Sequence, residues 1–243
     1  MKELLSIALL LFALASVSQG SESIVTDRPT QSASAFVLPQ GDLLLEAGVS
    51  SEKVTAGIRN STFLNALLRW GLTDGIELRL TQNYLGSKVL GERNSGFSPL
   101  TLGTKVHLMQ EDGWKPQMSV IGQITLRTGD NRFKPSSSIS EFRFNFQNTL
   151  SDNLSLGYNI GFISGENDYI LYSAVLGVAL ADGWSVFAEP YGFFGDGDSD
   201  QRFNAGVIYL YQPNLQFDVS FGSGISKIAP DSFVGFGVAW GFN

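Results

Sequence analysis

The chain has 243 residues, of which 16% are charged, 12% are aromatic and 27 are glycine. Its formal net charge of −7 argues against a nucleic-acid partner, because nucleic acids select basic surfaces. The absence of cysteine excludes disulfides, thiolate metal sites and a lipidated N-terminal cysteine. Low charge with abundant Phe and Gly is unusual for a soluble enzyme of this size.

Residues 1–20 have the layout of a secretory signal peptide. Lys2 gives a positive end, LLSIALLLFALASV is an apolar run, and Ser18 and Gly20 are small residues before a cleavage point. A membrane anchor is the alternative, but the apolar run is shorter than the about 20 residues that a helical span needs. We therefore predict cleavage after Gly20.

Residues 21–41 are predicted to form a periplasmic N-terminal segment. They contain Pro29, Pro39 and a run of small polar residues. Two interpretations stay open at this point: the segment plugs or lines the lumen of the following domain, or it is a loose periplasmic tail.

Residues 42–243 alternate apolar and polar side chains in twelve segments. A period of two is typical of strands with two unlike faces, and no segment shows a helical stripe. In chain order the segments are DLLLEAGVSS, FLNALLRWGL, GIELRLTQNY, LTLGTKVHLM, QMSVIGQITLR, EFRFNFQ, NLSLGYNIGF, YSAVLGVAL, WSVFAEPYGFF, RFNAGVIYLY, LQFDVSFGS and FVGFGVAWGF.

Short and long connections alternate between these segments. The short ones are predicted three-residue hairpin loops, each a type I turn followed by a left-handed Gly or Asn, with closing pairs such as Leu72 and Ile76. They lie at 73–75, 111–113, 151–153, 181–183 and 212–214. The long, polar connections lie at 52–62, 87–98, 128–138, 164–168, 195–200 and 223–231.

This pattern predicts an all-β fold, a twelve-stranded antiparallel transmembrane β-barrel with short periplasmic turns and longer extracellular loops. The strands must close into a ring because hydrocarbon offers the backbone no water to bond. Aromatic residues near strand ends fit interfacial girdles, namely Trp70, Trp114, Trp184, Tyr211 and Trp240. A soluble sandwich or small barrel is the alternative, but such folds rarely expose so many aromatics.

The C-terminus resembles the final-strand signal of proteins that are inserted into the bacterial outer membrane. Val238, Trp240 and Phe242 alternate to the end, although Asn243 replaces the usual terminal aromatic. The expected partners are therefore outer-membrane lipid, the barrel-assembly machinery and a small-molecule solute. No nucleic acid and no cofactor are expected.

Several stretches resemble the outer-membrane transporter family named after the meta-pathway of phenol degradation. The resemblance covers most of the mature chain, and its most specific parts are Thr26-Asp27-Arg28-Pro29 and Ala229-Pro230-Asp231. Other similar stretches are LLRWGLTDGIELRL, SPLTLGTKVHL, LRTGD, LSLGYNIGF and FAEPYGFF. Arg127 stands where the family commonly has Pro before Thr-Gly-Asp. The resemblance implies a barrel that passes small molecules across the outer membrane, with aromatic molecules as candidates.

The polar faces of the strands carry the candidate lumen-lining residues. Their mixed charges either select solutes or hold the interior together as ion pairs, and the structural role is favoured for any single residue. The candidates are Glu46, Arg69, Glu77, Arg79, Lys105, His107, Arg127, Glu141, Arg143, Glu189, Arg202 and Asp218. Twelve strands leave room for a narrow pore, helped by glycines expected to face inward at 157, 161, 235 and 237.

The predicted function is an outer-membrane channel or transporter for small solutes, with hydrophobic or aromatic solutes as first candidates. A structural or adhesive barrel that binds partners through its loops is one alternative. A lipid hydrolase is another, but His107 has no serine on its own strand face, so an enzyme is not expected. Asp196, Asp198 and Asp200 favour a solvated outer loop over a divalent-ion site.

Overall fold

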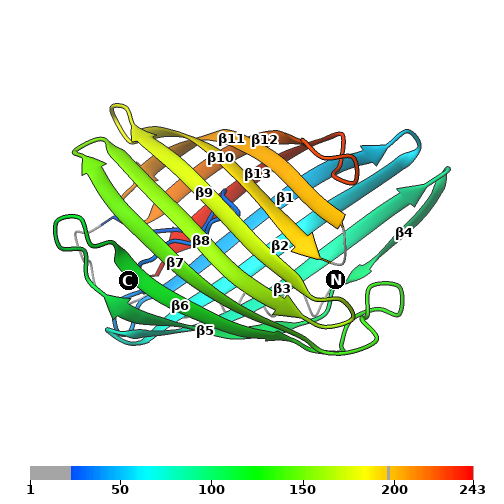
Figure 1. The fold of residues 1–243 in the computed structure, drawn as a ribbon, viewed down its shortest axis with the longest axis horizontal. Helices are drawn as coiled ribbons and strands as arrows, with labels where there is room; N and C mark the ends of the chain where they lie inside the picture. The colour runs from blue at the N-terminus through cyan, green and yellow to red at the C-terminus, as the bar shows by residue number, and fades with distance from the viewer. Residues whose placement is uncertain (1–22, 196–197, 243) are drawn as a thin grey trace.

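The structure is a computed structural model that describes residues 23–195 and 198–242. Its strands form one antiparallel sheet in the order β2-β1-β13-β12-β11-β10-β9-β8-β7-β6-β5-β3-β4, and pairing of β2 with β3 closes the ring (Figure 1). The strands are β1 (Leu43–Thr55), β2 (Ile58–Thr73), β3 (Ile76–Val89), β4 (Glu92–Phe97), β5 (Thr101–Met109), β6 (Gln117–Thr125), β7 (Ile139–Ser151), β8 (Leu154–Ser164), β9 (Tyr169–Ala179), β10 (Trp184–Gly195), β11 (Asp198–Gln212), β12 (Leu215–Gly224) and β13 (Ser232–Gly241).

Twelve of the 13 strands form the closed wall, because β4 pairs only with the outer part of β3. The predicted twelve-stranded antiparallel barrel is therefore confirmed. The described residues contain no helix that is long and apolar enough to cross a membrane. The predicted signal peptide lies outside the described residues.

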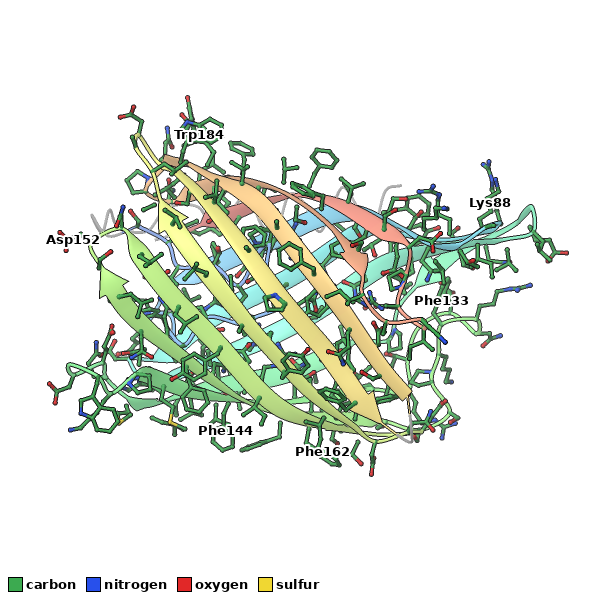
Figure 2. The ribbon with its side chains drawn as sticks, turned by 45° about the horizontal axis from the view of Figure 1, so that its top comes forward. Lys88, Phe133, Phe144, Asp152, Phe162 and Trp184 are labelled. Carbon is green, nitrogen blue, oxygen red and sulfur yellow. The ribbon has the colours of Figure 1, made fainter. Side chains whose placement is uncertain are left out.

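The wall has an apolar outside and a polar inside. On β3, Leu78 and Leu80 are 39% and 37% exposed, whereas Glu77, next to Leu78, is 0% exposed. Figure 2 shows Phe144 and Phe162 projecting from the outer surface. Burial is thus inverted relative to a soluble protein, as expected where lipid surrounds the wall and polar groups must be satisfied inside.

Aromatic residues gather at the end of the barrel that carries the short turns. Trp184 stacks on Tyr209 with ring centroids 4.4 Å apart, and Trp240 lies 4.5 Å from Phe242. Trp114, in the connection between β5 and β6, is 85% exposed. Amphipathic rings of this kind favour the membrane interface.

The tight turns are shorter than predicted. Thr73 pairs with Ile76, and the register shifts just before that pair. A two-residue turn and a bulge at Leu72 therefore replace the predicted three-residue loop, because the extra residue is absorbed in the strand. The same register shift precedes the pairs Ser151–Leu154 and Gln212–Leu215. Gly75, Asn153 and Asn214 are not among the residues with positive φ.

Two other turns depart from the prediction in different ways. Asp182 and Gly183 both have positive φ, at 53° and 81°, as a two-residue type I′ hairpin requires. The connection between β5 and β6 is longer, with Gly113 at φ 60° and an isolated bridge between Asp112 and Lys115.

Several predicted outer loops are in fact strand. β1 and β2 continue to Thr55 and Ile58, and β4 forms within 87–98. β10 reaches Gly195 and β11 begins at Asp198. Beyond the bilayer both faces of a hairpin meet water, so the hydrophobic alternation disappears while backbone pairing continues. Figure 1 shows the hairpins of β1–β2 and β3–β4 projecting from one end of the barrel.

Candidate functional site

Residues 23–42 precede β1 and run through the interior of the barrel (dark blue in Figure 1). Ala33, Ala35 and Leu38 are 8%, 0% and 6% exposed, although the segment has no regular secondary structure before Asp42. Buried irregular backbone must find a partner for each amide and carbonyl. The surrounding wall supplies many of these partners.

Two wall carboxylates accept hydrogen bonds from the backbone of the segment near its start and end. Glu46 accepts from the backbone amides of Asp27 and Arg28, at 3.0 and 2.8 Å. Glu77 accepts from the amide of Leu38 at 3.1 Å. Both carboxylates are 0% exposed, so these bonds replace the water that burial removed.

A third wall carboxylate holds the middle of the segment from the opposite side of the ring. Glu189 accepts from the backbone amides of Gln31 and Ser32, at 2.9 and 2.6 Å, and from Asn204 at 3.1 Å. The hydroxyl of Ser32 also lies 2.8 Å from that of Ser173. The segment therefore crosses the lumen instead of following one wall.

Amide side chains complete the same pattern. The backbone amide of Ala33 donates to Asn159 Oδ1 at 2.7 Å, and Asn159 Nδ2 donates to the carbonyl of Ala33 at 3.1 Å. Thr26 donates to the carbonyl of Arg28 at 2.9 Å and lies 3.1 Å from Gln216. The partners of the segment come from β1, β2, β3, β5, β7, β8, β9, β10 and β12.

Asp27 is the acidic centre of the segment. Its carboxylate lies 2.7 Å from Arg79, 3.1 Å from Lys105 and 3.8 Å from Arg69. The amide of Ser34 also donates to it at 2.8 Å. Burial by itself raises the pKa of Asp27, but the three cations outweigh burial and hold that pKa well below its usual value.

Arg69 connects the segment to two wall carboxylates. It binds Glu77 through two hydrogen bonds of 2.8 Å, binds Glu46 at 2.9 Å and donates to the carbonyl of Val25 at 2.9 Å. Arg69 is paired with Arg79 across β2 and β3. The mid-height layer, as we call this network, pairs buried acids with buried bases, namely Asp27, Glu46 and Glu77 with Arg69, Arg79 and Lys105.

Arg28 is held in a seat made by two glycines. It binds Asp218 at 3.0 and 3.2 Å, and it lies over Gly48 and Gly237, which pair with each other. A Cβ atom would lie 2.5 Å from the guanidinium at Gly48 and 2.1 Å from it at Gly237. Gly237 therefore makes room for Arg28 instead of widening a pore.

The remaining charged candidates lie toward the outer mouth. Arg143 lies 2.6 Å from Glu141 and donates to the carbonyl of Gln31 at 2.9 Å. Arg202 binds Glu52 at 2.8 Å and also Asp200. These side chains are only partly buried, and among them Arg143 also bonds the segment.

Arg127 does not line the lumen, contrary to the prediction. β6 ends at Thr125, and Arg127 is exposed in the following loop. The chain leaves the barrel wall there because the loop binds the end of β4, where the amide of Phe97 donates to Asp130 at 2.5 Å. The amide of Leu100 also donates to the hydroxyl of Thr128 at 2.9 Å.

His107 faces the lumen beside polar, uncharged neighbours. Its Nδ1 lies 3.3 Å from Gln117 Nε2. Ser119 is its partner across β5 and β6, a neighbour that inspection of one strand misses. Ser119 is 0% exposed, and its hydroxyl accepts from Asn145 at 3.2 Å. No described acidic group is bonded to this histidine in the way that a hydrolytic triad requires.

The acidic run at 196–200 gives no cluster of ligands in the described part of the chain. Asp198 and Asp200 belong to β11, and Asp196 lies outside the described residues. Asp200 pairs with Arg202 at 2.6 Å. The weak divalent-ion hypothesis therefore loses one of its ligands to an arginine.

Open compartments lie on either side of the mid-height layer. Toward the outer loops, a cavity of about 380 Å³ is lined by charged and polar groups that include Glu52, Arg202 and Pro29. Toward the short turns, a chamber of about 390 Å³ is lined by small, hydroxyl and aliphatic side chains such as Ser155, Val175 and Phe187. The segment separates two environments of different polarity.

Residues 26–242 match the family model described as "Putative MetA-pathway of phenol degradation". The chain belongs to this family. The resemblance noted in the sequence is therefore confirmed, and it includes the segment residues Thr26 to Pro29.

Solved structures share the fold of this family member. The COG4313 outer membrane channel from Pseudomonas putida F1 is 13% identical, with a TM-score of 0.65 over 93% of this chain and 100% of that chain. The KdgM porin is 10% identical, with a TM-score of 0.59 over 81% of this chain and 98% of that chain. The NanC porin is 6% identical, with a TM-score of 0.56 over 82% and 98%. No curated protein matches the chain.

The fold and the family place this chain in the bacterial outer membrane, as predicted. The small-solute channel expected from the sequence is the class of function that they support. The sequence did not single out the neutral residues that hold the segment, namely Asn159, Ser173, Asn204 and Gln216. Their only sequence signal is a small polar or amide residue at an inward position of a strand.

Proposed function

We propose that this phenol-degradation family member is an outer-membrane channel for small solutes whose lumen is closed by its own N-terminal segment. The observation that carries the proposal is the hydrogen bonding of residues 26–38 to strands around most of the ring. A solute cannot cross the mid-height layer while Glu46, Glu189 and Asn159 hold the segment. Passage therefore requires the segment to move.

The solute class follows from the two compartments. The outer cavity has charged walls at Glu52 and Arg202, which suit a polar group on an incoming solute. The inner chamber offers Val175, Phe187 and Ile208 together with serine hydroxyls. Its volume of about 390 Å³ accommodates a single aromatic ring with a hydroxyl group. We propose small aromatic alcohols and acids, in keeping with the pathway in the family's description.

Planar-bilayer conductance tests this function. The full mature protein should give rare, brief openings, and a variant that lacks residues 23–41 should give stable open channels. A matched control adds Arg69→Gln and Glu77→Gln to the same deletion. These changes remove the ion pair that the deletion uncovers, while the lumen stays free of the segment. Silence of the deletion variant, in protein shown to be folded by its heat-modifiable gel mobility, would contradict the proposal.

Solute identity needs a second assay. Liposomes that contain the deletion variant should take up phenol-sized aromatics with one polar group faster than protein-free liposomes. Uptake of equally small sugars at the same rate would contradict the proposed preference for aromatic solutes and would indicate a general pore. Binding of cells or matrix proteins through the loops, with no conductance in any variant, would favour the adhesive alternative.

We do not propose an enzyme. A lipid hydrolase would need His107 to act as a base on a neighbouring hydroxyl, and Ser119 is fully buried and bonded to Asn145. Phospholipid hydrolysis that disappears in His107→Ala would overturn this view. We further propose the barrel-assembly machinery as the partner during insertion, through the C-terminal strand β13, and outer-membrane lipid as the surrounding solvent.

A further inference from the structure

Four cations form a single row across the outer ends of β1, β2, β3 and β4. Lys53 pairs with Arg59, Arg59 with Lys88, and Lys88 with Arg93. Residues opposite each other in an antiparallel pair share one face and lie about 5 Å apart. Like charges in this arrangement destabilise a sheet. We call these four residues the cation row, and we look outside the chain for the group that offsets their repulsion.

The cation row is poorly neutralised within the described part of the chain. Lys53 forms a salt bridge with Asp231 at 2.8 Å, but both side chains are 47% exposed. Arg59 donates to the hydroxyl of Ser51 at 2.8 Å. No salt bridge involves Arg59, Lys88 or Arg93 among the described residues, and all three are exposed. The concentration of positive charge is notable in a chain whose net charge is −7.

The cation row faces away from the lumen. Glu52 lines the outer cavity and binds Arg202, and neighbouring residues of a strand point to opposite faces. Lys53 therefore points outward, together with its cross-strand partners. Figure 2 shows Lys88 projecting from the end of the barrel opposite Asp152 and Trp184. The inner face of the same strands carries Glu52, Asn60, Ser87 and Asn94, which contain no cation.

An aromatic row fixes the height of the cations relative to the membrane. Phe63, Tyr84 and Phe97 lie side by side, with ring centroids 6.1 and 5.1 Å apart. Phe63 and Phe97 are 55% and 44% exposed, and rings of this kind lie at the level of lipid headgroups.

On β2, β3 and β4 the cations lie four residues farther out than the aromatic residues. At about 3.3 Å per residue this is roughly 13 Å along the strand, or about 10 Å of height in a strand tilted by about 40°. Between the two rows lie the small residues Ser51, Ser61, Gly86 and Ser95. A headgroup anchored at the aromatic row can therefore reach the cations.

We propose that the cation row binds the phosphate groups of the glycolipid in the outer leaflet. Two of its members are arginines, whose planar guanidinium forms paired hydrogen bonds with phosphate oxygens. The arrangement places this lipid against the β1–β4 side of the barrel. It also explains why like charges are kept in register there: the bound phosphates supply the neutralisation that the chain lacks.

The test uses the folded full chain in detergent with purified lipid A as the probe. The variant Lys53→Gln, Arg59→Gln, Lys88→Gln and Arg93→Gln removes the row. The matched control Arg132→Gln, Lys134→Gln and Lys227→Gln removes three other outer cations. Native mass spectrometry measures bound lipid A, and heat-modifiable gel mobility measures folding.

The row variant should bind lipid A about tenfold or more weakly, because each of four cations near an anionic surface contributes. The control should bind within about twofold of the unmodified protein. Lipid A stripped of its phosphates should bind the unmodified protein as weakly as intact lipid A binds the row variant. In the absence of lipid the row variant should unfold at the same temperature as the unmodified protein or higher, because repulsion is relieved.

Three results would overturn the proposal. Equal binding of lipid A to the row variant and the unmodified protein is one. Equal binding of intact and dephosphorylated lipid A is another, since the protein would then recognise the acyl chains and not the phosphates. Displacement of lipid A by millimolar inorganic phosphate would identify a site for free anions instead of a lipid. If the row variant fails to fold, the single reversal Lys88→Glu gives the same comparison.

Discussion

The mid-height layer and the cation row use charge in opposite ways. In the mid-height layer Arg69, Arg79 and Lys105 each face carboxylates inside the same chain, and the charged groups are almost completely buried. In the cation row Lys88 and Arg93 face other cations and water. The comparison teaches that the charges of the mid-height layer are neutralised within the chain and hold the N-terminal segment. The charges of the cation row, in contrast, are neutralised by a ligand from outside the chain.

Removal of Arg69 from the mid-height layer should have the largest effect. Arg69→Met leaves Glu46 and Glu77 buried without their main partner, and breaking a buried pair from one side costs about 3–5 kcal/mol. The free energy of unfolding in urea should fall by that amount, and channel openings should lengthen. The control Lys115→Gln removes an exposed lysine paired with Asp112 at 3.5 Å, and it should change stability by less than about 0.5 kcal/mol. Equal stability of the two variants would show that the layer is not held by its charges.

Filling the glycine seat should have the next largest effect. In Gly237→Ala the new Cβ would lie 2.1 Å from the Arg28 guanidinium, so the guanidinium must shift, and we expect its contact with Asp218 to weaken or break. The loss of this charged contact costs about 1.5–3 kcal/mol, which should raise the open probability in bilayers by about tenfold or more. Gly122→Ala is the matched control, because a Cβ there meets no atom within 4 Å. An unchanged open probability in Gly237→Ala would show that the contact of Arg28 with Asp218 does not keep the channel closed.

A milder change tests the carboxylate that holds the middle of the segment. Gln31 and Ser32 donate to different oxygens of Glu189, so Glu189→Gln keeps an acceptor for only one of the two amides and also loses the charge. We expect a loss of at least about 1 kcal/mol in docking. Hydrogen exchange at Gln31 and Ser32 should accelerate by several-fold, while exchange in β8 stays constant. Acceleration in both places would point to general loosening of the barrel instead.

The smallest effect is expected from pH. The pKa of Asp27 is lowered in the docked segment, so docking gains stability above the ordinary Asp pKa of about 3.9 and loses it as the pH falls through the lowered value. Conductance should stay constant between pH 7 and 5 and rise only under stronger acid. Asp27→Asn should abolish this acid response. A rise already at pH 6 would implicate another group.

The sequence predicted the wall far better than the contents of the lumen. Alternation along 67–80 separates Leu78 from Glu77, because lipid and lumen impose opposite demands on neighbouring residues. The same alternation placed Glu189 and Asp218 inside. It did not predict which groups they bind, because the contact of Arg28 with Asp218 joins residues 190 apart in the chain.

The alternation of apolar and polar residues also failed to predict the structure beyond the bilayer, where the membrane no longer imposes that alternation. The polar stretches 52–62 and 87–98 were predicted as loops, yet they continue as strands in water and carry the cation row. Arg127 follows the alternation of β6 in sequence, but the binding of Asp130 to Phe97 at the end of β4 draws the chain away from the lumen. Tertiary contacts decide both outcomes.

A reversible lock on the segment tests the central claim most directly. The hydroxyls of Ser32 and Ser173 lie 2.8 Å apart, and the chain has no cysteine of its own, so Ser32→Cys with Ser173→Cys can form a single disulfide between the segment and β9. In bilayers the oxidised protein should remain closed at all voltages, and reduction should restore openings in the same membrane. Equal conductance before and after reduction, with the disulfide verified by mass spectrometry, would show that solutes pass while the segment stays in place.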